Sequence, residues 1–180
     1  MHIRTETDRP IWFSMWFLAS IATFGAAFFP MFYRLIESRN RHFSRDVELE
    51  KPITAFFNKH GKEMPVRAKI YHDMNAKVWA ASIILIIPIF VITYLLSKDL
   101  VDHENRQDII LANLFPERIF MPQTIPIRKY AVITIVTLGV GIVYWLYKIV
   151  NMYNAHFKAH REVDKEIVKL MEEKPIGESV

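Results

Sequence analysis

Histidines in the two halves of the chain are the side chains best suited to chemistry. His156 and His160 are four residues apart, so on a helix they face the same way and could hold a metal ion. His42 lies 114 residues before His156 in a segment of similar sequence, where the counterpart of His160 is Asp46. Two interpretations stay open: a metal or haem site, or histidines that form hydrogen bonds beside lipid headgroups. The second needs no cofactor, and from the sequence we assign none.

Asp99, Asp102, His103 and Glu104 form a second group of potential metal ligands. Carboxylates bind hard cations, and imidazole suits zinc or copper. Short acidic runs are usually solvated, however, so we expect no metal here either. The chain has no cysteine, which excludes disulfides, thiolate metal sites and cysteine nucleophiles. Because it also lacks nucleotide-binding and hydrolase motifs, no catalytic residue is predicted.

An internal repeat determines how the first histidine group is positioned. It relates segments 21–51 and 137–167. Matching residues such as His42 and His156 are 114 positions apart, so the residues that align with 21–51 are 135–165. Each copy passes from an apolar stretch into a charged one. We therefore expect two copies of one helix that crosses a bilayer and continues in water. Both copies would cross in the same direction, as in a parallel repeat about an axis along the membrane normal.

Three apolar runs determine the predicted fold. Ile11–Tyr33, Val78–Ser97 and Tyr130–Tyr147 carry no charge and contain 23, 20 and 18 residues. A helix needs about 20 residues to cross the hydrocarbon core of a bilayer. The sequence therefore predicts an all-α membrane protein with one membrane domain, 1–180. Its predicted parts are transmembrane helices 11–33, 78–97 and 130–147, a cytoplasmic helical segment 34–77, an outer loop 98–129 and a cytoplasmic helical tail 148–180.

The distribution of basic residues predicts the orientation. Segment 34–77 and the C-terminal tail together hold 16 Lys and Arg, and the other side holds seven. The positive-inside rule then gives a multi-pass cell-membrane protein with its N-terminus outside and its C-terminus in the cytoplasm. The basic residues are interleaved with acidic ones, which argues against nucleic-acid binding. Those expected to hold anionic lipid headgroups are Arg34, Arg39, Arg41 and Lys148.

Repeated small and polar residues suggest how the helices pack. Small residues let helices approach closely in a membrane, and Thr hydroxyls can bond between them. We expect a helix contact at the two Thr-x-Gly elements, and pairing of two asparagines as buried amides. The residues concerned are Thr23, Gly25, Thr137, Gly139, Asn40 and Asn154. None of the predicted spans holds an ionisable residue, which argues against a pump, a transporter or a bilayer-embedded haem or copper protein.

The repeated runs are T-F-G-x(5)-M-F-Y-R-L-I-E-x-R-N-x-H-F and T-L-G-x(5)-W-L-Y-K-I-V-x-x-Y-N-x-H-F. They resemble a family of small prokaryotic, archaeal-type helical membrane proteins with no assigned activity. Small helical proteins of this kind are also similar to accessory subunits of archaeal ammonia monooxygenase. That analogy is at the level of the fold only.

Three spans leave little interior for a site, so we expect a non-catalytic accessory subunit of a multi-subunit membrane complex, and the analogy implies a membrane monooxygenase as one such complex. Its partners would be other membrane subunits and anionic lipids, with no small-molecule substrate. Two alternatives stay open. One is a metal-dependent membrane enzyme that uses His42, His156 and His160, and the other is an anionic-lipid-binding membrane protein.

Overall fold

Six α-helices and one short 3-10 helix make up the computed structural model, which describes residues 10–67, 69–117 and 124–173. These residues contain no strand, so the all-α prediction is confirmed. In chain order the elements are α1 (Phe13–Ala22), α2 (Phe28–Lys59), α3 (Ala76–Ser82), the 3-10 helix η2 (Ile83–Leu85), α4 (Ile87–Leu114), α5 (Ile127–Val136) and α6 (Gly141–Glu173).

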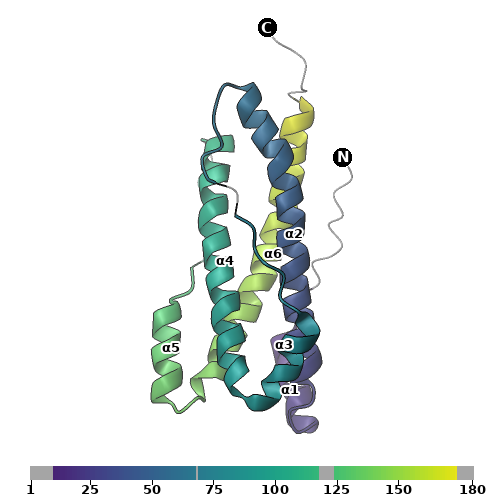
Figure 1. Ribbon diagram of the computed structural model, residues 1–180, viewed down its shortest axis with the longest axis vertical. Helices are drawn as coiled ribbons and strands as arrows, with labels where there is room; N and C mark the ends of the chain where they lie inside the picture. Colours follow the sequence, from purple (N-terminus) through teal and green to yellow (C-terminus); the bar gives the residue numbers. More distant parts are fainter. Residues whose placement is uncertain (1–9, 68, 118–123, 174–180) are drawn as a thin grey trace.

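The helices are arranged as three hairpins that point the same way. The long helices α2, α4 and α6 lie side by side and run in one direction (Figure 1). Each is preceded by a short helix, α1, α3 or α5, that runs in the opposite direction at the lower end of the view. We call this lower end, where the chain reverses in all three hairpins, the hairpin end. The opposite end of the bundle is the far end.

The repeated Thr-x-Gly element forms the reversing turn in two of the hairpins. Thr23 Oγ1 donates a hydrogen bond to Ala19 O (2.7 Å) and accepts one from Ala27 N (3.0 Å). Thr137 makes the same two hydrogen bonds at the corresponding positions, at 2.7 and 2.8 Å. One hydroxyl therefore bonds to a carbonyl that already accepts the backbone N–H of the same Thr, and it satisfies an amide at the start of the long helix, where backbone donors lack a helical partner.

Left-handed backbone conformations complete the reversal. Phe24 and Gly25 have φ of 50° and 91°, and Leu138 and Gly139 have φ of 50° and 96°. Glycine tolerates such angles without steric cost, which explains its place in both turns. The third hairpin reverses at Ile86, with φ of 62°, after the 3-10 helix.

The three predicted transmembrane helices, 11–33, 78–97 and 130–147, are wrong. A turn divides each apolar run, and no helix among the described residues combines the length and apolar character that crossing a bilayer requires. The Thr-x-Gly elements, expected at a contact between spanning helices, are the turns themselves. Pro88, which a spanning helix would have placed in mid-membrane, lies in the first turn of α4, where a missing N–H is tolerated.

Residues 98–114, expected in an outer loop, continue α4 beside the other long helices. Arg39 of α2 donates to the Asp99 carboxylate at 2.7 Å, which joins two segments predicted to lie on opposite sides of a membrane. The long helix α2 also continues past Pro52 as far as Lys59.

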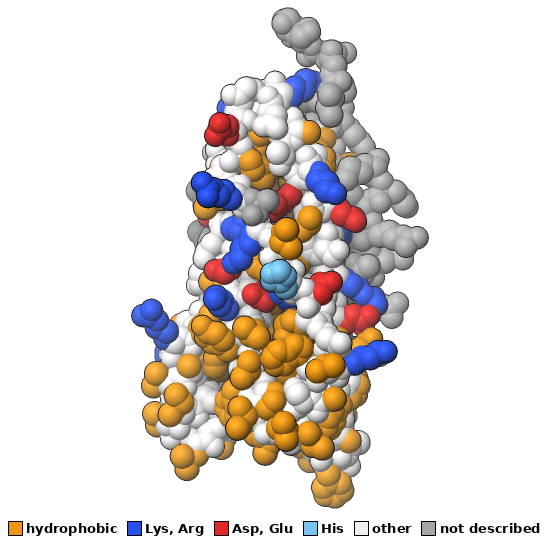
Figure 2. All heavy atoms as spheres, in the orientation of Figure 1, with side chains coloured by type: hydrophobic (Ala, Val, Ile, Leu, Met, Phe, Trp, Pro, Cys, Tyr) orange, Lys and Arg blue, Asp and Glu red, His pale blue; other side chains and the backbone are white. Residues whose placement is uncertain are grey.

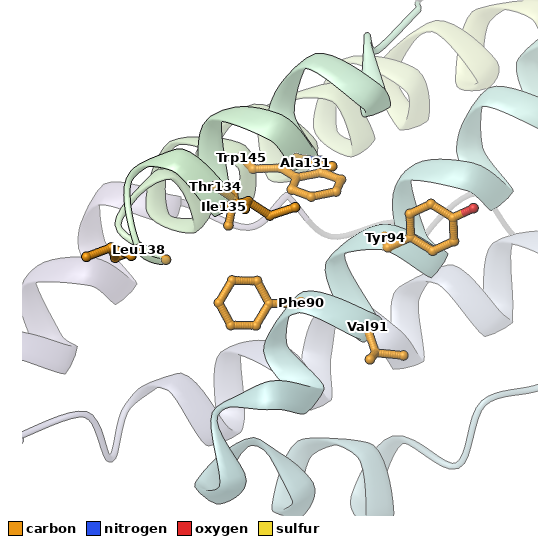
Figure 3. Close-up of a pocket in the computed structure, with 9 residues that line it drawn as sticks. Phe90, Val91, Tyr94, Ala131, Thr134, Ile135, Leu138 and Trp145 are labelled. Carbon is orange, nitrogen blue, oxygen red and sulfur yellow. The ribbon is translucent and has the colours of Figure 1, made fainter.

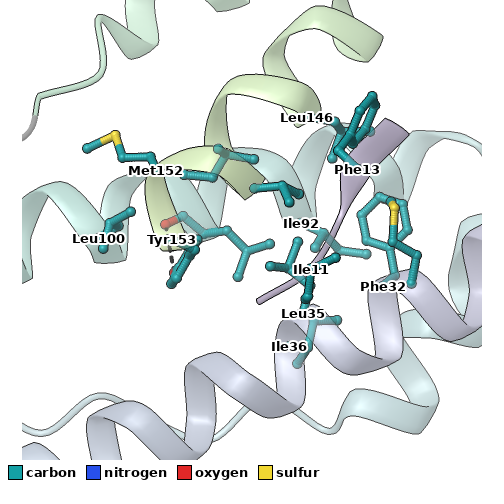
Figure 4. Close-up of a cluster of buried hydrophobic side chains, with 14 of the residues drawn as sticks. Ile11, Phe13, Phe32, Leu35, Ile36, Ile92, Leu100, Leu146, Met152 and Tyr153 are labelled. Atoms are coloured by element: carbon teal, nitrogen blue, oxygen red, sulfur yellow. Dashed lines mark hydrogen bonds between the residues drawn. The ribbon is translucent and has the colours of Figure 1, made fainter. Parts of the chain in front are cut away.

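Two apolar clusters hold the bundle together. The larger one fills the bundle toward the hairpin end and includes Phe32, Leu35 and Ile92 (Figure 4). At its edge Tyr153 donates a hydrogen bond from its hydroxyl to Leu96 O at 3.1 Å. The smaller cluster lies toward the far end and consists of Ile53, Phe57, Ile110, Leu111, Leu114 and Ile167. Along all three long helices, a layer of polar side chains separates the two clusters.

Candidate metal centre

Four buried histidines meet in this polar layer. His42 comes from α2, His103 from α4, and His156 and His160 from α6. Each offers one ring nitrogen such that the four nitrogens lie within 4.8 Å of one another. None of the four side chains belongs to a residue more than 7% exposed.

The hairpin architecture brings the histidines to one level. His42, His103 and His156 lie 14, 16 and 15 residues after the first residue of their helices. All three helices start at the hairpin end, so a rise of about 1.5 Å per residue places these residues roughly 21–24 Å along the bundle. His160 follows one turn later on the same face as His156.

The imidazole rings are in direct contact. Nε2 of His42 and Nε2 of His156 are 2.8 Å apart. The ring centroids of His156 and His160 are 4.0 Å apart, and those of His42 and His103 are 5.3 Å apart. One nitrogen of each ring therefore lies close to a nitrogen of each other ring, and His160 also contacts the side-chain amide of Gln107 through its ring nitrogens.

Two carboxylates from neighbouring turns complete the cluster. Asp46 Oδ2 lies 3.0 Å from His103 Nε2 and 3.5 Å from His42 Nε2, and its Oδ1 lies 3.9 Å from His160 Nδ1. Glu104 contacts Nδ1 of His156 in a short hydrogen bond, with the N–H donating. Asp46 therefore belongs to the centre itself, whereas Glu104 lies behind one ring and fixes its orientation, as carboxylates do behind metal-bound histidines.

No known protein family, curated protein or solved structure matches this chain. The centre is therefore interpreted from its own geometry and chemistry.

Burial keeps at least two of the rings neutral. It lowers the pKa of His156 to about 4, although the Glu104 hydrogen bond opposes this shift. The pKa of His160 also falls well below its ordinary value, because of burial and then the neighbouring histidines. Burial alone would raise the pKa of Asp46, but interaction with His42 and His103 outweighs it and lowers that pKa below its usual range. A neutral His156, a neutral His160 and an ionised Asp46 have the protonation states that metal ligands need.

Two buried polar atoms of the cluster have no aligned hydrogen-bond partner. These are Asp46 Oδ2 and His103 Nε2, which lie close together without the alignment of a hydrogen bond. Leaving a buried polar atom unsatisfied costs about 1–3 kcal/mol. A cation bound between the two atoms would satisfy both.

A small cavity opens on one side of the cluster. Its volume is about 40 Å³, and its polar lining includes Asp46, Glu50, His103 and Gln107. A cavity of this size has room for a water or another molecule of two or three atoms. Side chains of the far-end apolar cluster close its other side; they include Ile53, Ile110, Leu111 and Ile167.

The structure unites histidines that the sequence assigned to separate groups. His42, His156 and His160 meet, as the metal interpretation of the sequence requires, and His103 joins them from the segment expected outside the membrane. Of the rest of its group, Glu104 contacts His156, whereas Asp99 accepts a hydrogen bond from Arg39 and Asp102 accepts one from Lys69 at 2.6 Å. Asp46, the counterpart of His160 in the repeat, also lies among the rings.

The asparagines of the repeat do not pair with each other. Asn40 bonds to both the N–H and the C=O of Met74, just before α3. Asn154 makes the same two bonds to Ile11, just before α1. Each amide thus fixes a chain segment that enters a short helix, and the predicted amide pair is wrong.

The basic residues predicted to hold lipid headgroups differ in their surroundings. Arg39 is buried and bonds to Asp99, so it is not available to a headgroup. Arg34 and Lys148 are exposed, with their charges over the rings of Trp16 and Tyr144 at 5.5 and 5.6 Å. Arg41, the fourth residue predicted to hold a headgroup, is exposed and forms an ion pair with Glu37 on the same helix.

Proposed function

We propose that this chain is a metalloprotein that binds one divalent first-row transition-metal ion in the core of its helical bundle. The observation that carries the proposal is the meeting of four buried histidine nitrogens from three helices within 4.8 Å. A layer of hydrogen-bonded histidines is the simpler alternative. It would leave two buried atoms, Asp46 Oδ2 and His103 Nε2, 3.0 Å apart without the alignment of a hydrogen bond.

The donor set favours certain metals. Imidazole nitrogens suit zinc, copper and iron, whereas calcium and magnesium prefer oxygen ligands. Metal–nitrogen bonds of about 2.0–2.1 Å place tetrahedral ligands roughly 3.4 Å apart. To enclose one ion, the His42 and His156 nitrogens, now 2.8 Å apart, would separate slightly and the wider pairs of the cluster would approach. Asp46 would be a further ligand, and Glu104 would orient His156 through its Nδ1–H. Zinc, copper(II) or iron(II) therefore fits best.

Metal analysis of the purified full chain tests the proposal. The protein should be prepared without a histidine tag or chelator and its metal content measured by mass spectrometry. We expect about one ion per chain, and loss of that ion in His103→Gln and His156→Gln. His72→Gln is the matched control, because His72 is exposed and outside the cluster. Metal-free protein that also fails to bind added zinc, copper, iron or cobalt would refute the centre.

The cavity beside Asp46 and His103 favours a second, more specific function, which is metal-dependent chemistry on a small molecule. An open coordination position distinguishes catalytic from structural metal sites. Cobalt-substituted protein titrated with azide or cyanide should change its visible spectrum if a ligand enters from the cavity. Leu111→Trp should block this change and leave the bound cobalt in place. An unchanged spectrum at saturating anion would assign the ion a structural role only.

The prediction of an accessory subunit stays a prediction. A buried metal centre is compatible with it, since a subunit of a larger enzyme can hold its own ion. Gentle extraction followed by native mass measurement would identify the proteins that accompany the chain.

A further inference from the structure

The hairpin end is covered by exposed apolar side chains. Figure 2 shows them gathered at the lower end of the visible face, with the charged side chains above. The residues at the three turns extend farthest: Phe24, Leu138 and Ile86 are 101%, 95% and 65% exposed. A continuous apolar surface of this kind marks an interaction site.

The distance from the turns to the first charges is nearly the same in all hairpins. Arg34 and Lys148 each follow a turn residue, Phe24 or Leu138, by ten positions. Lys129 and Lys77 precede Leu138 and Ile86 by nine positions each, and Lys98 follows Ile86 by twelve. At about 1.5 Å per helical residue, these charges lie roughly 14–18 Å from the turns. The hydrocarbon core of a bilayer is about 30 Å thick, so each hairpin is long enough for one leaflet.

The boundary of the apolar end has the composition of a membrane interface. The exposed cations at this level are Arg34, Lys77, Lys98, Arg128, Lys129 and Lys148. Within the part of the chain that the structure describes, no acidic residue lies among the apolar residues below them. Cations at this level attract anionic headgroups. Aromatic rings accompany the cations, with Trp16 beneath Arg34 and Tyr144 beneath Lys148, as expected at a headgroup level.

An apolar groove runs into the hairpin end between α4 and the α5–α6 hairpin (Figure 3). Its volume is about 540 Å³, and Phe90, Val91, Ile135 and Leu138 are among the side chains that line it. A narrow groove that opens on the same apolar surface fits the acyl chain of a lipid.

We propose that the hairpin end inserts into one leaflet of an anionic bilayer, so that the protein is monotopic and the whole far end lies on one side of the membrane. The shared depth of the hairpins and the ring of cations favour lipid over a protein partner, which would require neither. The proposal is independent of the metal centre. That centre would lie about 22 Å from the turns, which is roughly 7 Å beyond the hydrocarbon boundary.

Single-cysteine variants test the insertion, because the chain has no cysteine of its own. The full-length protein is reconstituted in vesicles of neutral lipid with about a quarter phosphatidylglycerol. Phe24→Cys and Leu138→Cys carry a nitroxide label. We expect spectra relaxed by oxygen and not by a water-soluble nickel complex, at depths of 10–15 Å below the headgroups.

Labelling from one side decides the topology. Lys51 and Asn105 are exposed and outside the apolar end. Lys51→Cys and Asn105→Cys should react with a membrane-impermeant maleimide from the same side of sealed vesicles. Reaction from opposite sides would restore three spans and overturn the proposal. Relaxation of the nitroxide at Phe24→Cys by the water-soluble nickel complex in vesicles would also overturn the proposal, because the hairpin end would then not lie in lipid.

A charge variant tests the lipid preference. Arg34→Gln/Lys148→Gln should weaken association with anionic vesicles at least tenfold, since each basic residue near the surface contributes a severalfold factor. The matched control is Lys51→Gln/Lys165→Gln, a second pair of repeat counterparts at exposed positions far from the hairpin end, which should bind as the unchanged chain does. Equal binding of both double variants would contradict the role of the cation ring.

Discussion

Removal of the metal should loosen the bundle, because the proposed ligands come from three different helices. One ion bound to α2, α4 and α6 ties the hairpins together at their middle. An ion that binds only the folded chain stabilises it by about 4.1 kcal/mol when its concentration is 1,000 times the dissociation constant. For a chain of this length, each kcal/mol shifts Tm by about 2–4 °C. A chelator should therefore lower Tm by roughly 8–16 °C.

His103→Gln makes this effect specific to the centre. His103 is the one member of the four-histidine cluster on α4, so its loss disconnects that helix from the ion. The variant should unfold near the temperature of the chelated wild-type protein and should not respond to chelator. His72→Gln should respond as the wild type does. Thermal unfolding is followed by circular dichroism for the wild type and both variants. Each protein is measured without chelator, with chelator and after metal is restored.

Two results would refute this reasoning. A wild-type protein of proven metal content whose Tm ignores the chelator would show that the ion does not bridge the helices. A chelator response of equal size in His103→Gln would show that the metal binds elsewhere. Restoration of Tm by zinc or copper, but not by magnesium, would support nitrogen ligands in the core.

Three further predictions concern the fold. Gly141→Ala should destabilise the fold more than Gly25→Ala, because a Cβ at position 141 would lie 2.9 Å from the α5 backbone, whereas space is open at Gly25. In urea unfolding, the loss of unfolding free energy should be about 2 kcal/mol for Gly141→Ala and about 1 kcal/mol for Gly25→Ala. Arg39→Met should cost about 3 kcal/mol by leaving Asp99 unpaired, and adding Asp99→Asn should recover part of this loss in a double-mutant cycle. Burial raises the pKa of Tyr153 above its ordinary value of 10.0, so the unfolded chain loses the hydroxyl proton at a lower pH than the folded chain. The free energy of unfolding should therefore fall as pH rises above 10. Tyr153→Phe should reduce this fall in urea titrations at pH 9 and 11.

The sequence predicted the helical class, and it offered a metal site at three of the histidines only as one of two open interpretations. The repeat placed His42 and His156 at equivalent positions, and helical spacing placed His160 beside His156. It could not place His103, because the third hairpin shares no detectable sequence with the other two. The membrane-spanning interpretation then assigned His103 to the opposite side, so two parts of one site were treated as separate groups.

The spanning helices were predicted wrongly for a physical reason. Hydropathy measures how apolar a run is and does not detect a reversal of direction within it. The evidence for reversal was present in the repeated Thr and Gly, which are compatible both with close helix packing and with a turn. Only the positive φ angles at Gly25 and Gly139 distinguish the two. Asn40 and Asn154 were also assigned the wrong partners, because the sequence does not reveal which backbone segments return along the bundle.

The three hairpins share a spacing more than a sequence. Two of them carry Thr-x-Gly turns and N-x-H-F segments, whereas the third reverses at Ile86, with Pro88 in the first turn of its long helix. Each long helix nevertheless presents a histidine 14–16 residues after its start. This distance sets the height of the imidazoles above the turns. If the turns lie in one leaflet, the same distance keeps the metal ligands outside the hydrocarbon, where a charged ion and Asp46 are least costly to bury. The depth of insertion and the position of the centre are thus two consequences of one helical length, and a change in that length in a single hairpin would disturb both.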